Sequence, residues 1–527
     1  MRKDTERWVG DSTFRIHHSA FPRAHRRGWR STIAAALAVT SLVIVLCWGI
    51  ANYSYKAPAV VIGIGVGGLI LWNPFIGLLV VVLSLPFETI GMLGDPGAPG
   101  AVSLTKISGL MTCAAVIFDI LLRRRPLAWR RLFNRLSLLV VLLAAVTTAA
   151  AIIHPSEESF KETVRFFTIV VFFFVILHLT TNEARVRHIV FTWVITGTLV
   201  SVYSLIQRRF GATVGSEDWS PIAGTVIDVS EQDVGVMVRT AGTFTHPAWL
   251  ALYLSLTIPL TLYMLWSARR ALHRTLWTLA AVIQAVAIFY THARMGYLGM
   301  VLGVVLFLIR RRGGTAIVLW AVLVTAATYP LWPTTFQTRV ESILDYTSSE
   351  SSRTRIGQQL VGLWMFRDHP VTGVGPGNFE ENVKRYTDRV PDRWRVEVIG
   401  AHNLYVEVLA ELGVQGLVVL LLILVYAWRA AQQLRRRAPT TSTALLYEAM
   451  GASLLVFAFS AFFVHAQYQK EWWLLLAVIT AACSMTHADS ARSDQRTQAI
   501  GFSPPEGRTI ACNRTTDYSD SLSRRRL

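Results

Sequence analysis

The sequence has 527 residues, of which 53% are apolar and only 16% are charged, and its formal net charge is +18. An ordinary soluble domain carries about 25% charged residues, so this composition argues against a soluble enzyme of two or three domains and excludes a disordered protein. A nucleic-acid-binding protein would gather its basic residues on a polar face, whereas here long apolar runs dominate. We therefore expect an all-α, polytopic membrane protein that binds no nucleic acid.

The apolar runs divide the chain into predicted membrane and loop segments. The basic N-terminus, 1–30, is expected in the cytoplasm, and 31–206 is expected to form the N-terminal transmembrane helices. An external loop over 207–242 then leads to the central transmembrane helices of 243–332. Most of these runs approach the roughly 20 residues that a helix needs to cross the hydrocarbon core.

A second and larger external loop is predicted over 333–401, where basic, acidic and aromatic residues are mixed. Long loops in compact proteins are usually functional or disordered, and the aromatic content favours short helices at the outer membrane surface. C-terminal transmembrane helices are expected over 402–485. The tail, 486–527, is rich in Ser, Arg and Asp and is expected to be disordered in the cytoplasm.

The distribution of charge predicts the orientation of these helices. Fourteen runs are candidate spans, and about 12 to 14 transmembrane helices are expected, because twelve would keep the same parity. Lysine and arginine are concentrated in the segments that become cytoplasmic when both termini are cytoplasmic, and such a bias sets the orientation of short loops. We therefore expect a multi-pass protein of the cytoplasmic (inner) membrane, oriented by most of its positive charge.

His402 marks the point at which the large external loop enters a span, and the glycines Gly413 and Gly416 follow it. On a continuous helix His402 and Gly413 are close to three full turns apart and share a face. The glycines would then leave a groove beneath the histidine. The alternative is that His402 and Asn403 cap the helix and the glycines only serve packing. The sequence leaves both interpretations open.

Two arginines are expected at the same external level as His402. Arg239 ends the first external loop, and Arg294 stands at the turn between two central spans. Each alone could be a surface ion pair or a snorkelling side chain. Together, two arginines can neutralise a diphosphate through paired N–H donors, and a histidine can transfer protons near neutral pH. Their convergence predicts an external site for a lipid-linked diphosphate.

Two glycine patterns accompany these residues. The segment 368–379 alternates glycine with other residues, which can expose backbone N–H groups to an anion but more often forms a turn. We favour the turn. The series Gly296, Gly299 and Gly303 is expected to serve helix packing.

At these positions the chain resembles the O-antigen ligase and O-antigen polymerase superfamily, bacterial membrane glycosyltransferases that use undecaprenyl-diphosphate-linked glycans. The residues His402-Asn403, nine further residues and Gly413-x-x-Gly416 are similar to the family signature, and the stretch 368–379 resembles what precedes it. Arg239 and Arg294 resemble the arginines that stand before two of the family's spans. The similarity covers about 235–430.

The resemblance implies a metal-independent, inverting transfer of a glycan from undecaprenyl diphosphate to an acceptor hydroxyl, with no cofactor and with the active site on the external, periplasmic face. Arg239 and Arg294 would hold the diphosphate, and His402 would orient or deprotonate the acceptor hydroxyl. The acceptor would be a glycan, a lipid or a protein, in the biosynthesis of lipopolysaccharide or another cell-envelope polysaccharide. Candidate auxiliary residues are Arg353, Arg355, Asn403 and Glu411.

The chain also departs from the family pattern, and other functions remain open. Ala293 and Met295 flank Arg294 where the family usually has Ser and Gly, and His246 lies where Asn is common. Within the same chemistry, the enzyme could be a ligase, a polymerase of repeat units, or a ligase that modifies proteins. A transporter or flippase for lipid-linked sugars is the alternative of a different class. Against it, few charges lie deep in the spans, where transporters usually place functional charges.

Overall fold

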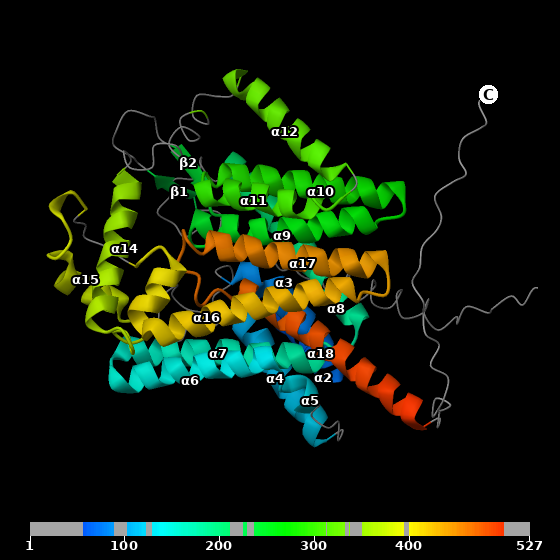
Figure 1. Ribbon diagram of the computed structural model, residues 1–527. Helices are drawn as coiled ribbons and strands as arrows, with labels where there is room; N and C mark the ends of the chain where they lie inside the picture. The colour runs from blue at the N-terminus through cyan, green and yellow to red at the C-terminus, as the bar shows by residue number, and fades with distance from the viewer. Residues whose placement is uncertain are drawn as a thin grey trace, which may run out of the picture.

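The protein is a bundle of long, roughly parallel and antiparallel helices with a smaller helical unit across one end (Figure 1). The computed structural model describes residues 56–88, 103–122, 129–210, 225–228, 237–311, 313–331, 337, 350–394 and 400–499. Several predicted segments lie outside these residues: the basic N-terminus, the first part of the N-terminal transmembrane region (31–55), most of the first external loop and the end of the tail.

The first half of the described chain is helical from end to end. Asn73 separates the first two helices and caps the second, and Ile70 of the first lies against Gly77 of the second. A 3-10 turn, Leu85–Phe87, follows the second helix. The helices are α2 (Lys56–Trp72), α3 (Pro74–Ser84), α4 (Leu104–Leu121), α5 (Trp129–Leu132), α6 (Arg135–Ile153), α7 (Glu157–Leu179) and α8 (Glu183–Phe210).

The second half adds a short hairpin and the helices that carry the predicted site residues. Strands β1 (Thr225–Asp228) and β2 (Met237–Thr240) pair antiparallel, with Val226 opposite Arg239. The helices are α9 (Pro247–Ser267), α10 (Ala271–Tyr290), α11 (Arg294–Leu308), α12 (Gly314–Thr328), α14 (Glu350–Asp368), α15 (Phe379–Thr387), α16 (Leu404–Arg436), α17 (Thr441–Ser460) and α18 (Lys470–Ala499), with 3-10 turns at Tyr329–Leu331 and Asp392–Trp394.

The predicted all-α, polytopic membrane fold is confirmed. Within the described ranges, eight helices have at least 18 residues and are apolar enough to cross a membrane, and two shorter apolar helices, Pro74–Phe87 and Arg294–Leu308, accompany them. Many large apolar side chains on their outer faces are exposed, including Leu110 at 74% and Leu138 at 64%. Such a surface suits hydrocarbon rather than water. The total of 12 to 14 spans stays a prediction.

Helix α9 lies at the centre of the bundle, between α11 and α17. In α11 the glycine series meets it directly: a Cβ on Gly296 would lie 2.8 Å from Ala251 Cβ, and one on Gly303 would lie 3.0 Å from Pro259 Cγ. Small residues let helix backbones approach closely. The prediction that these glycines serve packing is confirmed, and the close approach places the first turns of α9 and α11 side by side.

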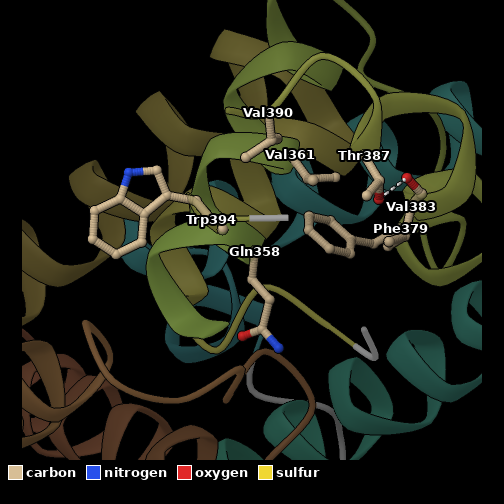
Figure 2. A pocket seen from close by; sticks show the side chains of 8 residues that line it. Gln358, Val361, Phe379, Val383, Thr387, Val390 and Trp394 are labelled. Atoms are coloured by element: carbon tan, nitrogen blue, oxygen red, sulfur yellow. Dashed lines mark hydrogen bonds between the residues drawn. The ribbon is translucent and has the colours of Figure 1, made fainter. Parts of the chain in front are cut away.

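The segment between α12 and α16 forms a unit with an interior of its own. Figure 1 shows α14 and α15 at one end of the bundle, with α14 running across the direction of the long helices. Figure 2 shows the apolar interior between them, where the ring of Phe379 points toward Val361. This ring also lies against Gly362, and Met365 and Tyr386 are fully buried in the same cluster. We refer to this end of the molecule as the α14 end.

Candidate active site

His402 lies in a tight turn at the α14 end, directly before α16. The backbone of Gly400 (φ 76°) and of His402 (φ 46°) is left-handed. Asn403 then caps α16, because its side-chain oxygen accepts hydrogen bonds from the N–H groups of Tyr405 and Val406 at 3.0 and 3.3 Å. A left-handed non-glycine residue costs on the order of 1–3 kcal/mol and often marks a functional position. His402 therefore belongs to the turn before α16 and not to the helix itself.

His402 is the first of three side-chain rings that contact one another in a row. Its imidazole lies 5.2 Å from that of His465, which in turn lies 5.1 Å from the ring of Trp249 (centroid distances). Burial, together with the nearby His465, Arg355 and His246, lowers the pKa of His402 to about 4. At neutral pH the imidazole is uncharged, and a neutral imidazole can accept a proton from a hydroxyl group.

Both predicted arginines lie at one turn at the same end of the bundle. Arg239 of β2 donates from Nε to the backbone carbonyl of Thr291 at 3.2 Å. Thr291 begins the turn between α10 and α11, in which His292 is left-handed (φ 51°), and α11 begins at Arg294. Arg239 therefore contacts the turn that leads into Arg294.

The packing of α11 on α9 brings this turn close to the cluster formed by His402, His465 and Trp249. Gly296, two residues after Arg294, lies against Ala251, which is two residues after Trp249. Trp249 contacts His465, and the Leu404 N–H donates to the carbonyl of Ala461, at the end of α17, at 2.8 Å. Arg239, Arg294 and His402, which come from three distant segments, thus converge at the α14 end.

The four candidate auxiliary residues have different environments. Arg355 of α14 is half-buried and close enough to His402 to influence its charge, whereas Arg353, two residues earlier, is exposed. Residues two apart on a helix do not share a face. Asn403 serves as the helix cap. Glu411 is only 2% exposed, and its carboxylate accepts hydrogen bonds from the N–H groups of Gly377 and Phe379. Of the two auxiliary arginines, Arg355 is the one that influences His402.

The glycine-rich stretch 368–379 docks onto a break in α16. The helix is interrupted at Gly413 (φ 68°, ψ −168°), and the Val414 N–H donates to the carbonyl of Pro370 at 2.9 Å. In return, the N–H groups of Val374 and Gly375 donate to the carbonyls of Ala410 and Glu411 at 2.9 and 3.0 Å. These two donors already have backbone partners, so the segment is a docking turn.

This docking excludes one of the two interpretations that the sequence left open. In that interpretation Gly413 opens a groove beneath His402 on a continuous helix. Instead the helix is broken there, and a Cβ on Gly413 would lie only 2.1 Å from the carbonyl oxygen of Val371. The space that the glycine leaves is filled by the loop, because the loop backbone completes the hydrogen bonds that the broken helix cannot make.

The docking turn is also held from its other side by the start of α7. Ser159 donates from Oγ to the carbonyl of Pro376 at 2.9 Å, and Ser156, the cap of α7, donates to the side-chain oxygen of Asn378 at 2.5 Å. Since α7 and α16 both lie in the bundle, the turn between them anchors the C-terminal end of α14 to the bundle.

Part of the chain is similar to a known protein family. Residues 279–421 match the family model described as O-antigen ligase. This part of the chain is therefore similar to the O-antigen ligase domain. The expected superfamily is thereby confirmed. A search of curated proteins gives no match.

The O-antigen ligase family consists of membrane enzymes of the glycosyltransferase type, ligases and polymerases. The matched segment includes Arg294, Arg355 and His402. The matched segment begins after Arg239 and ends before His465. The contacts of these two residues are therefore known from the structure and not from the family match. The chain is a multi-pass bacterial membrane protein.

Three residues at the α14 end were not predicted as site residues: His246, Trp249 and His465. His246 caps α9, with Nδ1 accepting from the Ala248 N–H at 3.1 Å. Within the described chain, these histidines do not form a group that could hold a metal ion. His246 could have been predicted as a site residue, because the sequence analysis had already identified it at a position where the family commonly has Asn. His465 has no motif around it, and only the fold brings it to His402.

Proposed function

We propose that this protein transfers a glycan from undecaprenyl diphosphate to an acceptor hydroxyl on the outer face of the cytoplasmic membrane. The observation that carries the proposal is the convergence of Arg239, Arg294 and His402 at one end of the helix bundle. Two cations and a neutral base are the groups that displacement of a diphosphate leaving group requires.

The transfer is written as a single displacement. The acceptor oxygen attacks the anomeric carbon of the donor sugar and forms the new carbon–oxygen bond. The bond from that carbon to the diphosphate oxygen breaks on the opposite side, which inverts the configuration. The acceptor proton moves to the His402 imidazole, and the bonding electron pair leaves with undecaprenyl diphosphate. Arg239 and Arg294 stabilise the charge that develops on the leaving oxygen, since guanidinium groups suit phosphate oxygens. No metal is needed in this scheme.

The orientation follows from the distribution of charge along the sequence. With both termini in the cytoplasm, the turns that carry Arg239, Arg294 and His402 are external. The α14–α15 unit then covers the site on the outer side of the membrane, where the acceptor arrives. A ligase and a polymerase of repeat units share this chemistry and differ only in the acceptor. We favour the ligase, with the polymerase as the second candidate.

The test of the function is glycan analysis of a deletion strain of the source bacterium. For a ligase, the finished polymer should persist on its lipid carrier while its attachment to the final acceptor is lost. Single unpolymerised repeats would identify a polymerase. A donor that stays on the cytoplasmic face, inaccessible to an external glycan-degrading enzyme, would instead indicate a flippase and contradict the proposal.

Arginine substitutions test the role of the two cations. Replacing Arg239 or Arg294 by Gln should lower transfer by about 10²-fold, because loss of one group that stabilises the developing charge typically costs 10²–10³ in rate. Transfer can be followed as labelled glycan moved to the acceptor in membranes of the deletion strain, which retain the donor. Arg367→Gln is the matched control, since Arg367 is an exposed arginine of α14 that lies over the Trp364 ring. Equal rates in all three variants would contradict the assignment.

A further inference from the structure

A second histidine contacts His402 from the turn between α17 and α18. The rings of His465 and His402 are inclined at 64° and their centroids are 5.2 Å apart. The same His465 ring meets Trp249 of α9 edge-on, at 5.1 Å and 90°. His465 therefore contacts both the first turn of α9 and the histidine that precedes α16, and any movement of its ring would disturb His402.

Packing alone does not explain why this residue is a histidine. The Nδ1 atom of His465 is buried and has no hydrogen-bond partner among the described residues. An unsatisfied buried polar atom costs on the order of 1–3 kcal/mol. A phenylalanine would make the same ring contacts without that cost. A function that uses the titratable imidazole would account for the cost.

The charged groups that face the two rings are cationic or already paired. Arg165 of α7 and His246 at the start of α9 influence His465, and burial together with these two groups lowers the pKa of His465 to about 4. Arg165 lies over the Tyr468 ring at 5.1 Å and pairs with Glu162 at 3.2 Å. From α14, Arg355 faces His402. Each positive charge disfavours protonation of either imidazole.

We propose that His465 is a positioning residue for His402: its ring fixes the orientation of the His402 imidazole, and protonation of His465 at acidic pH opposes protonation of His402. His402 then stays ready to take the proton of the acceptor hydroxyl, while His465 itself touches no reacting atom. This inference rests on the proposed function of His402 as the proton acceptor.

The first test measures protonation of His402 without using transfer activity. Diethyl pyrocarbonate acylates neutral imidazole, so its reaction with each histidine of the full-length protein in detergent can be followed by peptide mass spectrometry against pH. A free imidazole loses this reactivity as the pH falls through about 6.5, whereas His402 should keep it well below that pH. In His465→Phe, which retains the bulk of the ring, the midpoint for His402 should move to higher pH.

The second test measures transfer in membranes of the deletion strain. His465→Phe and His465→Ala should lower the rate by roughly ten- to a hundredfold, the size of effect expected from misplacing a catalytic group. Since His402 acts in its neutral form, a raised pKa should also move the acidic loss of activity to higher pH. Phe462→Ala is the matched control: this ring belongs to the same turn but packs against Tyr405, with centroids 4.5 Å apart and the rings tilted by 47°. Its rate and pH profile should match the unmodified protein.

Two results would overturn the inference. One is an unchanged transfer rate in both His465 variants. The other is a lower rate in His465→Phe with an unmoved midpoint for His402, which would mean that His465 only packs. If His402→Gln retained full transfer, the proposed function of His402 would fail instead, and the acylation experiment would still measure the coupling between the two rings.

Discussion

Replacing His402 by Gln or Asn should lower glycan transfer by about 10²–10⁴-fold, which is the usual contribution of a general base. Neither amide can take up the acceptor proton at neutral pH. Asn is the more informative replacement, because it tolerates the left-handed backbone that His402 adopts (φ 46°). Loss of activity in His402→Asn would therefore reflect missing chemistry rather than a strained turn. The measurement is labelled glycan attached to the acceptor in membranes of the deletion strain.

The control for this prediction is the folded state of the variant. His402→Asn should insert into membranes to the same extent as the unmodified protein and unfold at a similar temperature in detergent, because Asn403 still caps α16. His273→Asn changes an exposed histidine of α10 and should leave the transfer rate unaltered. Full activity of a stably folded His402→Asn protein would exclude His402 as the proton acceptor.

Replacing Gly413 by Ala should destabilise the protein by about 3 kcal/mol or more and reduce transfer with it. Alanine in a continuous helix is more favourable than glycine by roughly 1 kcal/mol. If Gly413 lay in an unbroken helix, the substitution would therefore be expected to stabilise the protein. The backbone of Gly413 (φ 68°, ψ −168°) lies in a region that is essentially restricted to glycine. Its new Cβ would also meet the Val371 carbonyl oxygen at 2.1 Å. Thermal unfolding in detergent measures the change.

The matched control is Gly109→Ala in α4, where a Cβ would meet nothing within 4 Å. This variant should be as stable as the unmodified protein or slightly more stable. If Gly413→Ala behaved in the same way, α16 would be continuous at this point and the 368–379 turn would not be docked between Ala410 and Val414. A loss of stability confined to Gly413→Ala would instead support the broken helix.

The membrane class and the main site residues could be predicted from sequence because each depends on local chemistry. Uninterrupted apolar runs have few alternatives to spanning helices. Arg239, Arg294 and His402 could be selected since each ends a loop where a span begins, and the family signature surrounds His402.

The meaning of the glycines and of the auxiliary residues depended on what lies against them. Gly413 looked like the floor of a groove, yet the backbone of the 370–375 segment occupies that space. Glu411 looked like a site carboxylate, yet it accepts hydrogen bonds from the start of α15. Helical periodicity describes which residues share a face. It does not predict where a distant loop will interrupt the helix.

By itself, the sequence determined the all-α membrane fold, the superfamily and the segments that supply two arginines and a histidine. Only the tertiary structure decided that α14 brings Arg355 rather than Arg353 to His402, and that His465 and Trp249 complete the cluster. The physical reason is the range of the interactions. Hydrophobic runs and caps act over a few residues of chain, whereas the burial and the electrostatic environment of an imidazole come from elements hundreds of residues apart that packing brings together.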